Sequence, residues 1–441
     1  MEEIDLLIDA RWVIPVNPAR RVLEDHSVAV RDGRIVAVLP RSLAHEAYAA
    51  VQTVSLPSHA LIPGLVNLHT HASMVLMRGL ADDMPLTRWF QDRIWPAEAQ
   101  HVSPQFVYDG TLLACAEMLR GGITCFNDMY FYPAEAARAA LDMGMRAALG
   151  LIVIDAPTAY ATDADDYIAK GLSLRDALRD QPLLSFCMAP HAPYSVSDRT
   201  FSHLITLAEE LDLPVHMHVH ESPEEIERSL AAHGVRPLER LRRLGLVGPN
   251  LIAVHAVHLT QAEIELLAEN GSSVAHCPSS NMKLANGFAP VPAILEQGIN
   301  TGLGTDGAAS NNRLDLFQEM RTAALIAKAV AADASVLPAD RALSMATLDG
   351  ARALGLDHAI GSIEPGKFAD LVAVEFTAPA LLPCYDPISH IVYVAGRENV
   401  SHTWVEGRIL VENYRLTQPP KNDLENLTGL WQNRLSTKTK A

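Results

Sequence analysis

Apolar runs of strand length alternate with helical stretches through the middle of the chain. The runs are nearly continuous in apolar residues, which is typical of strands buried on both faces. Strand-then-helix units over roughly 300 residues favour an α/β fold with a (β/α)8 TIM-like barrel over an open sheet, although periodicity alone does not separate the two. Thr260 followed by Glu263 predicts a capping box at one helix start. The strand-like runs are 60–68, 183–189, 214–219, 251–254 and 271–275, and the helical stretches include 106–120, 197–211 and 260–270.

Both ends of the chain are rich in short strand-like runs instead. Asp32-Gly33 between two of them is a hairpin turn signal, because glycine adopts positive φ at little cost. We predict a small β-sandwich domain built from both termini, residues 1–60 and 366–418, around a barrel of residues 61–365, with a C-terminal tail at 419–441. The strand-like runs are 4–8, 27–30, 34–38, 371–375, 390–394, 402–405 and 408–411.

Composition and charge narrow the class of protein. Of the 441 residues, 49% are hydrophobic and 20% are charged, which supports a large buried core and argues against disorder. A net charge of −17 disfavours binding to nucleic acid or anionic lipid. The five cysteines form no C-x-x-C pair, the first residues are acidic where a signal peptide is basic, and no apolar run approaches the roughly 18 residues of a membrane span. We therefore expect a cytoplasmic protein.

Two histidines close the first apolar run of the middle region. His69 and His71 stand one residue apart after Pro63 and Gly64, and residues i and i+2 of a strand point to the same face. Both imidazoles can therefore share one metal ion at the mouth of a barrel. A generic H-x-H pair is as often two polar residues that end a strand, but the buried strand before this pair favours a metal site.

A second histidine cluster ends the run at 214–219. His218 stands three residues before Glu221, which places a candidate ligand near an acid/base carboxylate. Three histidines on one strand exceed what packing needs. We expect the flanking His216 and His220 to be core or rim residues rather than ligands.

Further polar residues follow other predicted strands. Asp306 lies among glycines, where Asp-Gly is more often an ordinary turn, but its place at an eighth strand end favours a ligand. His191, His255 and His276 also end strand-like runs. Because barrel enzymes carry their chemistry at the C-terminal ends of the strands, the series as a whole predicts an active site.

The order of these motifs resembles the amidohydrolase superfamily. P-G-x-x-x-x-H-x-H, H-x-x-E, V-H-x-x-H, H-C-P-x-S-N and G-T-D follow one another, and residues 361–371 match the segment by which such enzymes re-enter their β-domain. Members with two metals use a carboxylated lysine on the fourth strand, and the run at 183–190 has no lysine. The resemblance therefore implies a hydrolase with one divalent ion, Zn²⁺ in the first place and Fe²⁺ as an alternative. Its implied ligands are His69, His71, His218 and Asp306.

Shorter stretches are similar to the 5′-methylthioadenosine/S-adenosylhomocysteine deaminases of that superfamily. From the residues alone, Glu98 would be interpreted as a solvated helix residue, but the resemblance implies that it accepts hydrogen bonds from ribose hydroxyls. The stretches are residues 95–98, 189–194, 276–284 and 304–312. The substrate contacts that the resemblance implies are Trp95, Glu98, His191, Glu221 and Asp306.

The implied reaction is hydrolytic deamination of a 6-aminopurine nucleoside to its inosine analogue and ammonia. Glu221 would donate a proton to N1 of the ring, His255 would orient the attacking water, and Asp306 would accept the proton of that water. Candidate substrates are 5′-methylthioadenosine, S-adenosylhomocysteine and adenosine. Some members bind the amino-acid tail of S-adenosylhomocysteine with an arginine in the loop at 155–166, which here has no Arg or Lys. We therefore expect methylthioadenosine or adenosine to be the better substrate.

Two other classes of function stay open. Guanine and other purine-base deaminases, and triazine hydrolases, share most of these motifs, and ammonia release across nucleosides, free bases and triazines would separate them. A non-catalytic barrel that only binds ligands is the alternative of another class, and the full ligand set together with Glu221 argues against it. We expect a small-molecule partner, no nucleic acid and no membrane, and a homo-oligomer is compatible with the sequence.

Overall fold

The computed structural model describes residues 1–418 and 424–436. These residues form two compact units, one from residues 1–67, 116–125 and 315–418, and one from residues 68–115, 126–314 and 424–436. The first unit contains sheet A. The second contains sheet B, except for the first residues of two of its strands.

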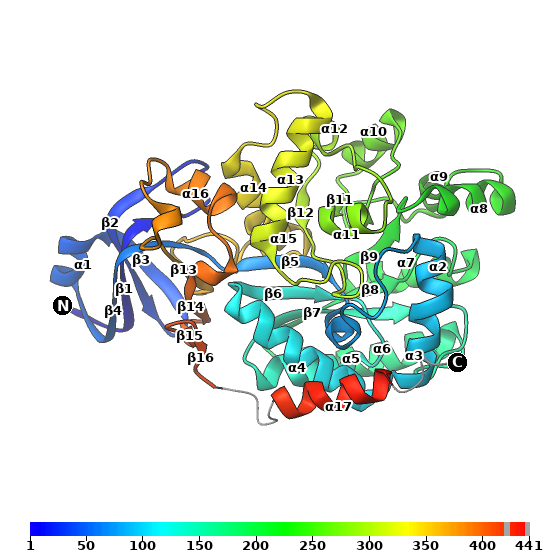
Figure 1. Cartoon of the computed structure of the whole chain (residues 1–441), viewed down its shortest axis with the longest axis horizontal. Coiled ribbons are helices and arrows are strands. Elements are labelled where there is room, and N and C mark those ends of the chain that lie inside the picture. The colour runs from blue at the N-terminus through cyan, green and yellow to red at the C-terminus, as the bar shows by residue number, and fades with distance from the viewer. Residues whose placement is uncertain (419–423, 437–441) are drawn as a thin grey trace. The chain divides into compact units, whose positions relative to one another are not determined.

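Sheet A has eight strands that come from both ends of the chain. Their order is β16-β15-β14-β13-β4-β1-β2-β3 (Figure 1). Neighbouring strands are antiparallel except β1 and β4, which are parallel. The prediction of a β-domain built from both termini is confirmed. The strands are β1 (Glu2–Val13), β2 (Leu23–Arg31), β3 (Arg34–Pro40), β4 (Tyr48–Pro63), β13 (Leu371–Glu375), β14 (Val400–Val405), β15 (Arg408–Glu412) and β16 (Arg415–Leu416).

The core of the first unit is a cluster of apolar side chains that come mostly from the strands of sheet A. Ile8, Leu61 and Trp404 belong to it and are buried. The predicted hairpin between β2 and β3 is confirmed, because Asp32 and Gly33 have φ of 52° and 74°, as a type I′ turn requires.

Sheet B has eight strands in sequence order, from β5 to β12. Its neighbouring strands from β7 to β12 are parallel. A 3.0 Å hydrogen bond from the Asp306 amide, beyond β12, to the His69 carbonyl of β5 joins the two edges of the sheet. Gly304 permits this approach, because a Cβ there would lie 2.8 Å from the His69 Cβ. The strands are β5 (Leu65–Thr70), β6 (Ile123–Asp128), β7 (Arg146–Val153), β8 (Leu184–Pro190), β9 (Val215–Val219), β10 (Leu251–His255), β11 (Ser273–His276) and β12 (Thr301–Leu303).

Helices follow the strands of sheet B, so the predicted (β/α)8 architecture is confirmed. The capping box is also present, since Thr260 and Glu263 each accept the other's backbone N–H at the start of α10. No helix in residues 1–418 and 424–436 is long and apolar enough to cross a membrane. The helices are α1 (Arg41–Ala47), α2 (Leu86–Trp89), α3 (Trp95–His101), α4 (Pro104–Arg120), α5 (Pro133–Asp142), α6 (Ala164–Leu178), α7 (Asp198–Leu211), α8 (Pro223–His233), α9 (Pro237–Leu244), α10 (Gln261–Glu269), α11 (Pro278–Lys283), α12 (Val291–Glu296), α13 (Leu316–Ala331), α14 (Ala339–Met345), α15 (Leu348–Ala353), α16 (Pro387–Tyr393) and α17 (Leu424–Ser436).

Two strand predictions are wrong. The β-branched run at 390–394 belongs mostly to helix α16, because the Asp386 side chain accepts the N–H groups of Ile388 and Ser389 and caps a helix that Pro387 begins. The run at 60–68 is two strands, since β4 ends at Pro63 and β5 begins at Leu65 in the other sheet.

The predicted C-terminal tail contains helix α17. This helix lies beside α4 in Figure 1. Its Trp431 indole donates to an Asp109 carboxylate oxygen of α4 at 2.9 Å and packs edge-on against Phe106, with ring centroids 5.1 Å apart. Residues 419–423 and 437–441 of that tail lie outside the described residues. The predicted domain boundaries stay a prediction.

Candidate active site

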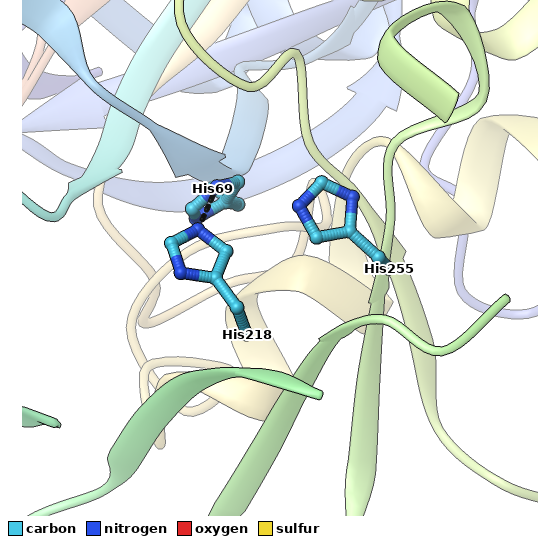
Figure 2. Close-up of side chains that lie close together, drawn as sticks. All are labelled: His69, His218 and His255. Atoms are coloured by element: carbon cyan, nitrogen blue, oxygen red, sulfur yellow. Dashed lines mark hydrogen bonds between the residues drawn. The ribbon is translucent and has the colours of Figure 1, made fainter. Parts of the chain in front are cut away.

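The four predicted metal ligands meet at the C-terminal ends of the strands of sheet B. His69 lies on β5, His71 follows it, His218 lies on β9 and Asp306 follows β12. The Nε2 atom of His69 is 3.3 Å from Nε2 of His218 and 3.3 Å from Oδ1 of Asp306. The same Oδ1 is 3.2 Å from Nε2 of His71. Figure 2 shows the rings of His69 and His218 turned toward each other, with His255 of β10 beside them. These side chains form two groups that share His69 and could each hold a metal ion: His69, His71 and Asp306, and His69, His218 and His255.

The second ring nitrogen of two ligands is held by a backbone carbonyl. Nδ1 of His71 lies 2.5 Å from the Met129 oxygen, and Nδ1 of His218 lies 2.8 Å from the His191 oxygen. Because a carbonyl only accepts hydrogen bonds, each Nδ1 donates a proton, which leaves Nε2 as the atom that would bind a metal once it carries no proton. Burial lowers the pKa of His218 well below its usual range, so this ring is neutral at pH 7, as a ligand must be.

His216 on β9 and His220 just after this strand have other partners. Nε2 of His216 lies 2.9 Å from Nδ1 of His69, so His216 supports a ligand from behind. Nε2 of His220 accepts the Leu238 N–H at 3.1 Å, and its Nδ1 lies 3.2 Å from an Arg236 nitrogen. Within the described residues, neither belongs to a group of side chains placed to hold a metal.

Asp306 is oriented as an anionic ligand. Its Oδ2 accepts hydrogen bonds from the hydroxyls of Ser280 and Ser310, both at 2.6 Å, which leaves Oδ1 facing the imidazoles. Burial alone would raise the pKa of Asp306, but the hydrogen bonds with His69 and His71 hold it well below its usual range. Although burial alone would lower it, the hydrogen bond with Asp306 raises the pKa of His71 to about 9, so metal binding would displace a proton from this ring. Three imidazole nitrogens and one carboxylate oxygen then form a donor set that fits a divalent ion such as Zn²⁺ or Fe²⁺.

Glu221 and His255 stand beside this ligand cluster. Nε2 of His255 is 3.9 Å from Oε1 of Glu221, and its Nδ1 is 2.9 Å from Oδ1 of Asn281. Asn286 donates to Oε1 of Glu221 at 3.1 Å. Burial raises the pKa of Glu221, so its carboxyl group keeps a proton to higher pH than an exposed glutamate does. An acid and an oriented imidazole therefore face the same space.

That space is a cavity of about 620 Å³, within the size range of small-molecule sites. Glu98 and Trp95 of α3 line it, as does His191, which follows β8. Burial raises the pKa of Glu98 to about 7, although the Tyr130 hydroxyl donates to its carboxylate at 2.7 Å. Burial lowers the pKa of His191 to about 4 and leaves this ring neutral. The cavity thus brings the predicted substrate contacts together with Glu221, His255 and Asp306.

Several supporting side chains were not singled out by sequence reasoning. Three of them lie inside the family motif stretches given above, so those motifs were the only sequence signal for a role at the site. They are Ser280, Asn281 and Ser310. Tyr130 stands two residues beyond the end of β6, where the strand-end rule could have found it. Asn286 lies in a loop after α11, and no pattern in the sequence points to it.

Comparison with known proteins places the chain among hydrolases. Residues 60–410 match the Amidohydrolase family. The chain is 46% identical, over 97% of its length and 96% of the other protein, to a 5-methylthioadenosine/S-adenosylhomocysteine deaminase of Saccharophagus degradans. It is 41% identical, over 94% of its own length and 95% of the relative's, to a 5′-deoxyadenosine deaminase of Methanothermobacter thermautotrophicus. An adenosine deaminase from Xanthomonas campestris, solved with bound zinc, superimposes with a TM-score of 0.96 at 50% identity, covering 98% of this chain and 99% of that one.

Proposed function

The chain belongs to the amidohydrolase family, and we propose that it is a metal-dependent deaminase of 6-aminopurine nucleosides. The substrate class comprises 5′-methylthioadenosine, S-adenosylhomocysteine and adenosine, and the products are the inosine analogue and ammonia. One observation carries the proposal most strongly: the candidate ligands and Glu221, whose pKa is raised by burial, face one cavity that Glu98 also lines.

The ligand cluster would hold one divalent ion. His69, His71, His218 and Asp306 supply the donors, and the absence of a lysine from β8 supports one ion rather than two. The donor set supports zinc. Such an ion lowers the pKa of a water molecule that it binds from 15.7 to about 7.

Glu221 would serve as the proton donor to N1 of the adenine ring. Burial raises its pKa, which favours the acid form relative to an exposed glutamate, and the Asn286 amide fixes the carboxyl group in place. Protonation of N1 draws electrons from C6, where water attacks.

The attacking water would be handled by His255 and Asp306. When Nδ1 of His255 donates to Oδ1 of Asn281, Nε2 of the neutral ring is left to accept a hydrogen bond from the water. Asp306 is held ionised and can accept the water's proton, which then reaches the departing amino group.

Glu98 would recognise the sugar. A carboxylate accepts hydrogen bonds from two neighbouring ribose hydroxyls, and Tyr130 orients the group from behind. Trp95 and His191 supply further walls of the same cavity. A sugar-binding carboxylate favours nucleosides over free bases.

A substrate panel on protein of measured metal content tests the proposal. The change in absorbance from adenine to hypoxanthine would be followed for methylthioadenosine, S-adenosylhomocysteine, adenosine and adenine, and ammonia release for guanine and a chlorotriazine. We expect nucleosides to exceed adenine in kcat/KM by at least about tenfold, the value of one charge-assisted hydrogen bond. Turnover of guanine or the triazine above all nucleosides would refute the assignment.

A further inference from the structure

A small branch of the cavity carries a basic side chain. Arg228 of α8 lines both the main cavity and a branch of about 50 Å³. No other lysine or arginine of the described residues lines either space. The loop at 155–166 also lines the main cavity, through residues 156–160, and none of these five side chains is charged. Among the described residues, a negative group on a substrate would therefore meet a guanidinium or ammonium only at Arg228.

The guanidinium of Arg228 has no anionic partner within the described residues. It interacts with the ring of Tyr194, whose centroid is 5.9 Å from Cζ. Two neighbouring arginines are engaged instead, Arg236 with Glu263 at 2.8 Å and Arg240 with Asp198 at 2.6 Å. Because a guanidinium offers five N–H donors, Arg228 keeps a complete set for a ligand.

The branch opens on the side of the cavity where Glu98 would hold the ribose. Trp95 lines both spaces, and it stands three residues before Glu98 on α3, so the two side chains lie on the same face of that helix. Arg228 lies five residues after Pro223, or ~7.5 Å along the helix at 1.5 Å per residue. Glu221, which precedes the helix, lines both spaces as well, so Trp95, Glu221 and Arg228 all lie where the branch meets the main cavity.

The charges of the branch match a zwitterion better than a dianion. Glu221, Glu224 and Glu225 line it together with Arg228. Glu225 already accepts two backbone N–H groups, whereas Glu224 is exposed. Burial raises the pKa of Glu225 to about 8, so this group is mostly protonated at pH 7 and adds little charge. A phosphate would face the exposed Glu224 as well as the guanidinium. An α-amino acid offers a carboxylate to Arg228 and an ammonium to the acidic side.

On the premise of the proposed deaminase, we propose that this branch binds the α-amino-acid tail of 5′-thioadenosine substrates, with Arg228 as the residue that binds the carboxylate. This assignment reverses the expectation drawn from the uncharged loop. It brings S-adenosylhomocysteine fully into the substrate class, through a cation on α8.

The test compares substrates that differ only in the tail. Wild type, Arg228→Met and Arg228→Lys would be assayed with methylthioadenosine, S-adenosylhomocysteine, the analogue with a 3-aminopropylthio tail and the analogue with a 3-carboxypropylthio tail. We expect Arg228→Met to lower kcat/KM for both carboxylate substrates at least tenfold relative to methylthioadenosine. The ratio for the aminopropyl analogue should change less than twofold, and Arg228→Lys should restore part of the loss.

Arg199→Met is the matched control, because its side chain is 88% exposed, pairs with Asp165 and lines neither space. An equal loss on all four substrates would overturn the proposal in favour of a structural role. No loss on the carboxylate substrates would also overturn it. A fifth assay uses 5′-AMP, and a loss on that substrate alone would overturn the proposal and assign the branch to phosphate. Calorimetric measurement of the affinity for the same nucleosides separates this proposal from the proposed deaminase. If wild type turned over none of them, the deaminase would be refuted. If Arg228→Met still lost affinity for the carboxylate nucleosides alone, the tail site would stand.

Discussion

Buried histidines occur in both sheets, and only those of sheet B form a candidate metal site among the described residues. In sheet A, His59 of β4 and His402 of β14 face each other with ring centroids 6.2 Å apart. Burial lowers the pKa of His59 to about 4, and burial lowers that of His69 in sheet B to about 3. A burial-shifted pKa therefore does not by itself distinguish a ligand from a core histidine.

The difference lies in what surrounds the rings. Nδ1 of His402 lies 2.8 Å from the Ser401 hydroxyl, and its ring stacks on Trp404 with centroids 5.5 Å apart. In residues 1–418 and 424–436, no third donor joins His59 and His402 in a ligand group. In sheet B, parallel strands bring their ends to one edge, so side chains distant in sequence aim at one point. Convergence, rather than burial, marks the site.

Removing one histidine from each sheet should give the largest difference between the two regions. His218→Ala should lose the bound metal and lower kcat by at least about 10³-fold, since a Lewis-acid ion contributes several kcal/mol. His402→Gln should keep full metal content. Elemental analysis of both purified variants, with thermal melts to confirm folding, gives the answer. Full metal occupancy in His218→Ala would contradict its role as a ligand.

Replacing the acid beside the candidate ligands should separate loss of catalysis from loss of the metal. Glu221→Gln should keep the metal near one equivalent per chain and lower kcat by about 10²–10⁴-fold, the usual value of a general acid. Glu227→Gln, an exposed position on the helix that follows Glu221, is the matched control. Ordinary turnover by Glu221→Gln, measured on methylthioadenosine, would remove Glu221 from the mechanism.

The pH dependence should show a smaller effect of the same group. Because burial raises the pKa of Glu221, its acid form persists to higher pH than that of an exposed glutamate and is lost as the pH rises through that pKa. The kcat/KM of wild type should therefore fall about tenfold per pH unit above it, whereas the residual activity of Glu221→Gln should lack this alkaline limb. An alkaline limb of the same midpoint in both proteins would assign it to another group.

The sequence points to the candidate ligands because they obey local rules. His69 and His71 share a strand face by the period of two, and His218 and Asp306 follow apolar runs of strand length. The alternation of strands and helices then placed these ends at one edge of a barrel. Family motifs added Glu98, for which the local pattern alone indicated a solvated helix residue.

The failures of sequence reasoning have equally specific causes. Capping by Asp386 overrode a β-branched run and produced α16, because a side-chain cap together with Pro387 at the first helical position outweighs β propensity. Arg228 was overlooked because its place at the cavity depends on α3 and α8 lining one space, which no local pattern encodes. Long-range packing thus decided what local rules left open.

Stepwise return of metal to stripped protein tests the central claim most directly. The account predicts that metal-free protein does not deaminate methylthioadenosine. Activity should then rise in proportion to added Zn²⁺ and reach its plateau at one equivalent per chain. Full activity in the metal-free protein, or a plateau at two equivalents, would contradict the account.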